Sequence, residues 1–352
     1  MPWFDAGESA VEASAWVDSN TLGLSPEWSG RTAEPGERSP RFDLRFPSRL
    51  RPFRSHRRAR YVSLAESYQR CETLARQTGK NFFYSFLTLP RDRFQAMCAL
   101  YAFMRVTDDL ADSDAPLEQR AAALRDWRAQ LAEACATGES AHPLLPAVAD
   151  MLRRYQVPVR YLTDVITGVE LDLHPVAIET FADLERYCYH VAGAVGLACI
   201  HVWGFHDERA IPVAIDCGTA FQLTNIVRDV REDALNGRVY LPAEDLRRFG
   251  VEPHDLQAAL ASPRVVELLQ FEAARAREYY HRMQPLFGWL DPPGRPILET
   301  MVTIYGGLLT EIERRHYDVF TRRVELGKAR KLYSVARSLL RHKWRMLFAP
   351  AG

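Results

Sequence analysis

The chain has 352 residues, of which 47% are apolar and 26% charged, so it is long enough to bury one large core or two modest ones. Its 45 basic and 45 acidic residues cancel, which excludes the strong overall field typical of proteins that bind nucleic acid or polyacidic ligands. The six cysteines lie in apolar stretches without a Cys-x-x-Cys pair, which argues against a zinc site or a disulfide framework. We therefore expect reduced, buried thiols in a cytoplasmic protein.

The first 60 residues differ in composition from the rest. Residues 1–37 hold seven acidic residues against one arginine, and residues 38–60 hold nine arginines against one aspartate. The segment is rich in Pro, Ser and Gly and lacks helical periodicity, which predicts a disordered extension over residues 1–60 before a helical domain over residues 61–350. No secretory signal is expected, and no apolar stretch approaches the roughly 20 residues that a membrane-spanning helix needs.

Helical signals dominate from Ser63 onward. Ser63 and Glu66 form the S-x-x-E pattern of a capping box, which predicts a helix to about residue 79. Further helices are expected over residues 90–112, from Pro116 to about residue 138, and from about residues 143, 158, 181, 207, 263, 296 and 328. Only residues 237–242 remain as possible extended structure, so the predicted fold class is all-α, in a single helical domain.

The first segment with chemical character is the acidic end of the helix expected over residues 90–112. Asp108 and Asp112 are four residues apart and share one helix face, and Arg105 lies one turn earlier on the same stripe. Like charges at this spacing cost roughly 0.2–0.5 kcal/mol in an isolated helix, so a compensating cation is expected. Carboxylate oxygens suit Mg²⁺, which completes its shell with water and substrate phosphate. A solvent-exposed acidic helix end is the alternative.

The second segment is a ladder of oxygen donors at Asn225, Asp229 and Asp233 in an otherwise apolar helix, with Gln222 before it and Arg228 beside it. Unpartnered buried amides and carboxylates would each cost a few kcal/mol, so the ladder predicts a polar ligand. Two such helices facing each other would form a cage for a diphosphate and its bridging metal ions. The predicted metal ligands are Asp108, Asp112, Asn225, Asp229 and Asp233.

Aromatic and small residues supply candidate walls for an apolar substrate. Aromatic faces stabilise a cationic intermediate by about 0.5–2 kcal/mol per contact, although core packing is the alternative for each ring. Gly193, Gly196 and Ala198 leave room beside a helix, which fits either a long apolar tail or tight helix packing. The candidate aromatic residues are Phe82, Tyr101, Tyr240 and Tyr305.

Five segments in a specific order resemble the squalene/phytoene synthase family, and the likeness runs from about residue 68 to residue 305 or beyond. It implies a class I isoprenoid synthase fold with a central active-site cavity. It also implies that Asp108, Asp112, Asp229 and Asp233 bind Mg²⁺ and that Arg105, Arg228 and Asn225 hold diphosphate or metal, with Gln222 as a further candidate. The segments are Asn-Phe-Phe-Tyr-Ser-Phe at 81–86, Tyr-Ala-Phe-Met-Arg-Val-Thr-Asp-Asp-Leu-Ala-Asp at 101–112, Tyr-Cys-Tyr-His-Val-Ala-Gly-Ala-Val-Gly at 187–196, Gln-Leu-Thr-Asn-Ile-Val-Arg-Asp-Val-Arg-Glu-Asp at 222–233 and Gly-Arg-Val-Tyr-Leu-Pro at 237–242.

The resemblance implies an enzyme that joins two prenyl diphosphates head to head. Loss of diphosphate from one substrate would leave an allylic cation, which the double bond of the other attacks, and proton loss would close a cyclopropane. A second ionisation would rearrange the ring, after which hydride from NADPH gives squalene or proton loss gives phytoene. Tyr187 and Tyr240 are the candidate catalytic tyrosines, although tyrosine hydroxyls and the released diphosphate are both possible bases.

Segments 81–86 and 109–112 favour the C30 reaction, from farnesyl diphosphate to presqualene diphosphate or squalene. The alternative, which segment 187–196 fits about as well, is geranylgeranyl diphosphate to phytoene. NADPH is expected only for squalene, and no Gly-x-Gly-x-x-Gly motif follows a strand. A non-catalytic family member is a remote alternative, disfavoured because the four aspartates are present. Head-to-tail synthases and terpene cyclases are disfavoured by the Asn225–Asp233 ladder.

The C-terminal residues from about 328 combine an apolar stripe with a basic opposite face. This pattern is typical of a helix at a membrane surface, and both prenyl substrates and their hydrocarbon product partition into lipid. A closing helix of the bundle shows the same pattern and is the favoured reading. Weak, salt-sensitive peripheral membrane association is therefore the most that we expect, with no nucleic-acid partner. The stripe residues are Leu332, Val335, Leu339, Leu340 and Leu347.

Overall fold

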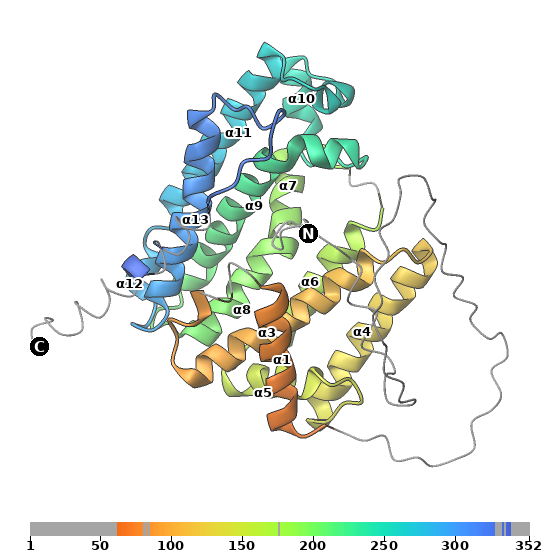
Figure 1. Ribbon diagram of the computed structural model, residues 1–352, viewed down its shortest axis with the longest axis vertical. Coiled ribbons are helices and arrows are strands. Elements are labelled where there is room, and N and C mark those ends of the chain that lie inside the picture. Colours follow the sequence, from red (N-terminus) through yellow and green to blue (C-terminus); the bar gives the residue numbers. More distant parts are fainter. Residues whose placement is uncertain are drawn as a thin grey trace, which may run out of the picture. The chain divides into compact units, whose positions relative to one another are not determined.

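The computed structural model describes residues 62–79, 83, 85–174, 177–327, 333 and 336–338. Within these ranges the regular secondary structure is helical, apart from one isolated bridge between Phe205 and Leu290 (Figure 1). The all-α prediction is confirmed, and residues 237–242 form an irregular segment rather than a strand. The predicted extension over residues 1–60 and the C-terminal apolar stripe lie outside the described residues.

The first helices begin and end where their punctuation predicts. The Glu66 backbone N–H donates to Ser63 Oγ (3.2 Å), but the Glu66 side chain pairs with Arg70 (2.8 Å) instead of completing a capping box. Gly138 ends the third of these helices with φ at +75°, a conformation that glycine adopts without steric cost. The helices are α1 (Leu64–Thr78), α3 (Arg91–Ala111), α4 (Leu117–Thr137), α5 (Leu145–Arg154) and α6 (Val159–Leu171).

The second half of the chain contains a continuous helical rod that passes from α-helix to π-helix and back to α-helix. A π-helical stretch joins α7 to α8 without a break, and such stretches are frequent near functional sites. The elements are α7 (Phe181–Cys188), η2 (Tyr189–Gly193, the π-helix), α8 (Ala194–Trp203), α9 (Ala210–Leu235), α10 (Ala243–Phe249), η3 (Pro253–Gln257, a 3-10 helix), α11 (Pro263–Arg282), α12 (Leu286–Trp289) and α13 (Arg295–Arg314).

Helix α9 is the central helix of this half. It packs against η2, α8, α11 and α13, and Figure 1 shows it between them. By length and apolar composition α9 is the one described helix that could cross a membrane, but 72% of its most apolar window is buried inside the protein. Its apolar character therefore serves the core. Helix α8 also packs on α3 and α6, so it connects the two halves.

Glycines allow close contact between α9 and the rod beside it. A Cβ at Gly218 would lie 2.7 Å from the backbone carbonyl of Ala192, and one at Gly196 would lie 3.1 Å from the carbonyl oxygen of Ala214. A Cβ at Gly193 would meet the Ile215 side chain at 3.3 Å. Of the two readings of these small residues, tight packing accounts for Gly193, whereas Gly196 serves packing and also lines a cavity described below.

A buried carboxyl pair joins α10 to α11. Glu272 is 1% exposed, and Arg275 Nη1 donates to both Glu272 Oε2 (2.8 Å) and Asp245 Oδ2 (2.8 Å). The Arg275 guanidinium stacks on Phe181 and Phe271, 3.9 and 4.6 Å from their ring centres. Burial raises the pKa of Glu272 to about 7 against the opposing charge of Arg275, with the neighbouring Asp245 carboxylate adding to the rise. One arginine therefore serves two carboxyl groups, of which one readily holds a proton.

This pair predicts a pH-dependent stability. The pKa of Glu272 rises from 4.5 to about 7 on folding. The stabilisation of the folded protein that comes from protonated Glu272 is therefore fully present below pH 4.5 and is lost as the pH rises through about 7. Glu272→Gln mimics the protonated form, so it should stabilise the protein by about 1–3 kcal/mol at pH 8 and have little effect at pH 4.5. Urea unfolding of both proteins at the two pH values measures this, and a difference independent of pH would contradict it.

Candidate active site

The C-terminal turn of α3 carries the first acidic pair. Asp108 is buried and Asp112, which caps the helix, is exposed. Burial, together with the charge of Asp112, raises the pKa of Asp108 to about 7. Arg105 was expected beside Asp108 and Asp112, but its Nη2 pairs with Asp109 Oδ1 at 2.6 Å. The two aspartates thus lie in the last turn of α3 and at its end, and Arg105 has a different ion-pair partner from the one expected.

The polar ladder of α9 lies in the protein interior. Gln222 and Asn225 are 0% exposed, and both polar atoms of each amide lack a hydrogen-bond partner among the described residues. Asp108 Oδ2 is also buried and also lacks a hydrogen-bond partner among the described residues. Buried amide and carboxylate atoms without partners cost about 1–3 kcal/mol each, so a polar ligand is needed to offset them. These orphan atoms belong to residues predicted to bind the ligand.

Two arginines hold the carboxylate of Asp229. Arg228 Nε donates to its Oδ1 at 2.8 Å, and Arg323 Nε and Nη2 donate to Oδ1 and Oδ2 at 3.1 and 3.3 Å. Burial alone would raise the pKa of Asp229, but the two guanidiniums outweigh it and hold that pKa below its ordinary value. Asp229 is therefore the ionised member of the ladder, with positive charge concentrated around it.

Asp233 lies one turn further along the ladder, and Arg238 follows it five residues later. Burial raises the pKa of Asp233 to about 7, with Asp229 adding to the rise and Arg238 opposing it. Burial alone would lower the pKa of Arg238, but Tyr240 and the carboxylates of Asp172 and Asp112 hold it above its ordinary value. Arg238 thus lies within electrostatic range of both aspartate segments.

Tyr187 and Tyr240 meet over a carboxylate that sequence reasoning did not identify. Their rings stack at 5.0 Å, and their hydroxyls donate to Asp172 at 3.1 and 3.2 Å. Asp172 caps the C-terminus of α6, Tyr187 lies on α7, and Tyr240 lies in the irregular segment after α9. Burial raises the pKa of Asp172, although Arg238 and the two hydroxyls oppose the rise. The structure therefore brings the two predicted catalytic tyrosines together.

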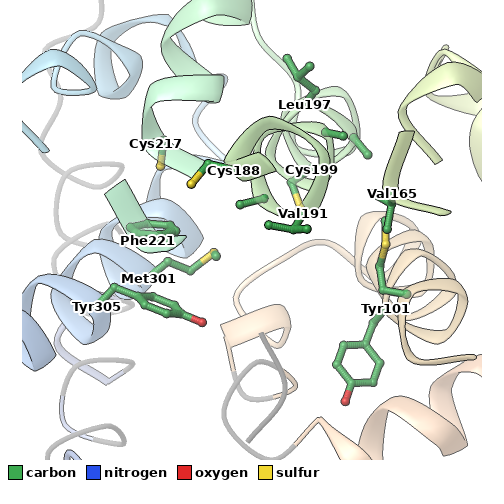
Figure 2. Close-up of a cluster of buried hydrophobic side chains, with 14 of the residues drawn as sticks. Tyr101, Val165, Cys188, Val191, Leu197, Cys199, Cys217, Phe221, Met301 and Tyr305 are labelled. Carbon is green, nitrogen blue, oxygen red and sulfur yellow. The ribbon is translucent and has the colours of Figure 1, made fainter. Parts of the chain in front are cut away.

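The candidate aromatic residues are divided between two sides of an apolar cluster. Tyr305 stacks on Phe221 at 4.7 Å, and Figure 2 shows Met301 beside this pair and Tyr101 on the far side of the cluster. The Tyr101 hydroxyl donates to Thr78 Oγ1 (3.1 Å), and burial raises its pKa to about 12. Tyr101 and Tyr305 therefore do not form one wall, and Phe82 lies outside the described residues.

A small apolar cavity is lined in part by residues on the face of α9 that carries the polar ladder. Cys217 and Phe221 precede Asn225 and Asp229 at spacings of four, so cavity and ladder share one stripe. An apolar space adjoining a buried polar end fits a ligand with a charged head and a hydrocarbon tail. The lining residues are Gly196, Cys199, Ile200, Trp203, Ala214, Cys217, Gly218, Phe221, Leu286 and Met301.

The acidic residues suit a metal that shares its shell with a phosphate. Among the described residues, no group of three or more His, Cys, Asp or Glu side chains lies close enough to hold a metal by itself. Mg²⁺ is typically bound by one or two carboxylates with water and substrate phosphates completing six oxygens. The unpartnered Asp108 Oδ2 and Asn225 Oδ1 supply further oxygen donors. The donor set therefore fits Mg²⁺ bound together with a diphosphate.

Three polar residues at the site were not identified from the sequence: Asp172, Arg238 and Arg323. Asp172 is a lone acidic residue at a helix end, and Arg323 lies 94 residues from Asp229 without a recognisable motif. Arg238 lies inside the segment 237–242 that carried the resemblance, so that segment was the available signal.

Comparisons with known proteins agree with this geometry. The family model described as squalene/phytoene synthase matches residues 75–330. The chain is 34% identical to a 15-cis-phytoene synthase of Synechococcus elongatus, over 80% of this chain and 94% of that protein. It is also 34% identical to a phytoene synthase of Mycobacterium tuberculosis, over 79% and 92%. Its fold matches a crystal structure of a dehydrosqualene synthase with TM-score 0.73 and 30% identity, over 80% and 98%. With this coverage and the two acidic helix segments in place, the chain belongs to the squalene/phytoene synthase family of prenyltransferases.

Proposed function

We propose that this prenyltransferase joins two molecules of geranylgeranyl diphosphate head to head to give phytoene, in a reaction that requires Mg²⁺. The observation that carries this proposal is that relatives at 34% identity over about four fifths of the chain are named phytoene synthases. The C30 reaction, which segments 81–86 and 109–112 favoured, has support from the structural neighbour named dehydrosqualene synthase at 30% identity. The relatives thus favour the C40 alternative over the C30 reading.

The charged residues of the site fit the binding of a diphosphate group. Asp108 and Asp112 on α3 and Asn225, Asp229 and Asp233 on α9 would hold Mg²⁺, which when bound neutralises the diphosphate and favours its departure. Arg228 and Arg323 already surround Asp229, and Arg238 adds positive charge from the other side. These guanidiniums would orient the diphosphate and stabilise the negative charge that develops as it leaves.

The small apolar cavity beside α9 offers one point of contact for the tail of a long substrate. Gly218, in its lining, precedes Asp229 by eleven residues on α9, which is about 16 Å along a helix axis. A cation formed at the polar end would be shielded from water by the buried Phe221 and Tyr305 rings. Proton loss ends the reaction to phytoene, so no hydride donor is needed and NADPH is not part of the proposed function.

A product assay tests the substrate assignment. Purified protein with Mg²⁺ should convert geranylgeranyl diphosphate to phytoene at a kcat/KM at least about tenfold above that for farnesyl diphosphate, which corresponds to about 1.4 kcal/mol of discrimination. Addition of NADPH should leave both rate and product unchanged. Gas chromatography with mass spectrometry identifies the hydrocarbon, and squalene or dehydrosqualene as the faster product would overturn the C40 assignment.

A further inference from the structure

Asp172 is placed to control two hydroxyl groups at once. Tyr187 Oη lies 3.1 Å from both carboxylate oxygens of Asp172, and Tyr240 Oη lies 3.2 Å from Oδ1. The two rings are 2% and 6% exposed, so their hydroxyls have little access to bulk water. Three separate elements contribute to this contact: the end of α6, the helix α7 and the segment that follows α9. Asp172 therefore joins parts of the chain that its own helix does not reach.

The chemistry of the contact fixes the direction of each hydroxyl. A phenol has one hydrogen, and an ionised carboxylate can only accept, so both tyrosines donate to Asp172. The lone pairs of their oxygens then point away from Asp172, where they can accept a hydrogen bond or a proton. Without a carboxylate at this position, either hydroxyl would be free to rotate its hydrogen toward another acceptor.

The surrounding charges place this contact next to the diphosphate site. Arg238 lies within electrostatic range of Asp172, of Asp112 on α3 and of Asp233 on α9. The Asp233 charge also reaches Tyr240. Tyr240 and Asp172 therefore share charged neighbours with the two acidic segments, where the proposed reaction takes place.

We propose that Asp172 is a positioning residue that turns the Tyr187 and Tyr240 hydroxyls so that one of their oxygens can accept a proton from the reacting substrate. This rests on the proposed function. In the proton-loss step a C–H bond of the cationic intermediate breaks and its electron pair forms the new carbon–carbon bond. The proton passes to a tyrosine oxygen, and the hydrogen of that tyrosine moves to Asp172. The net change is one proton transferred from carbon to the carboxylate, and no oxidant is needed.

Asp172→Asn tests this role. The amide has the same size as the carboxylate, but its NH₂ group donates a hydrogen bond where a carboxylate oxygen accepted one. The variant should lower kcat by at least about a hundredfold, the usual contribution of a positioned proton acceptor, while KM stays within about threefold of wild type. Asp172→Glu should recover at least about tenfold relative to Asn. A kcat for the folded Asn variant within about threefold of wild type would overturn the proposal.

A matched control and a triple variant separate a positioning role from a merely structural one. Asp164, also on α6, accepts from the half-buried Tyr189 Oη at 2.6 Å, so Asp164→Asn alters a similar hydrogen bond and should leave kcat unchanged. Combining Asp172→Asn with Tyr187→Phe and Tyr240→Phe should cost no more than the worst single change, because the groups act as one unit. Losses that multiply would contradict the role.

Two further outcomes keep the test decisive. If Asp172→Asn does not fold, Tyr187→Phe and Tyr240→Phe still remove the hydroxyls and keep the rings, and wild-type kcat in both would overturn the proposal. All variants are assayed with whichever prenyl diphosphate the wild type uses faster. A preference for the C15 substrate would therefore refute the proposed chain length and leave the comparison among these variants unaffected.

Discussion

Asp108→Asn should abolish most activity while leaving the protein at least as stable as wild type. The raised pKa of Asp108 shows that its buried carboxylate is disfavoured in the folded protein, and the uncharged amide removes that cost. The same substitution removes a hard anionic ligand from the Mg²⁺ site and should lower kcat by about 10²–10³-fold. Gain of stability with loss of activity is the signature of a group retained for function.

Asp229→Asn provides a contrast within the same site. The Asp229 carboxylate accepts hydrogen bonds from Arg228 and Arg323. An amide at this position has only one acceptor oxygen and no charge, so the two guanidiniums lose part of their hydrogen bonding and their ion pairs. This variant should lose activity to a similar extent but also lose stability. Asp216→Asn, on the outer side of α9 where Asp216 pairs with Arg282 at 2.6 Å, is the control and should retain wild-type turnover. Thermal unfolding and steady-state rates measure both effects, and near wild-type turnover in Asp108→Asn or Asp229→Asn would refute the metal-site assignment.

Gly218→Ala should be strongly destabilising although it adds a single methyl group. The new Cβ would lie 2.7 Å from the Ala192 carbonyl and 2.8 Å from the Gly193 nitrogen, and these backbone atoms cannot yield as a flexible side chain would. Overpacking of this kind typically costs about 1–3 kcal/mol, and it would push α9 away from η2. Because Gly218 also lines the apolar cavity, turnover should fall as well.

Gly306→Ala on α13 is the matched control. Its Cβ would meet the Tyr280 ring at 3.8 Å, an ordinary contact, and alanine stabilises a helix interior by about 0.5–1 kcal/mol relative to glycine. Urea unfolding should therefore move in opposite directions for the two substitutions. Equal effects of the two would show that helix propensity, rather than the close approach of η2, governs position 218.

The sequence predicted the helices and the two acidic segments because both follow from local periodicity. Pro90 and Pro116 mark helix starts that the structure places one residue later, at Arg91 and Leu117. The four-residue spacing of Asn225, Asp229 and Asp233 determines their common face whatever the tertiary fold.

The contacts that the sequence did not predict are long-range or depend on rotamers. Arg323 reaches Asp229 across 94 residues, and Asp172 reaches Tyr240 across 68, so no local pattern indicates either pair. Arg105 has acidic neighbours three and four residues away, Asp108 and Asp109. Side-chain geometry rather than spacing determines that Arg105 pairs with Asp109. Chain length of the substrate depends on how the apolar cavity ends, which is a property of several packed helices.

Position-labelled substrate tests head-to-head joining most directly. Geranylgeranyl diphosphate carrying ¹³C at C1, the carbon that bears the diphosphate, is incubated with the protein and Mg²⁺, and the hydrocarbon is examined by ¹³C NMR. Joining through the two diphosphate-bearing ends predicts a product in which the two labelled carbons are bonded to each other and show one-bond coupling, with no product when Mg²⁺ is chelated. Labelled carbons separated along the chain, as head-to-tail joining gives, or a cyclised product from a single substrate molecule, would contradict it.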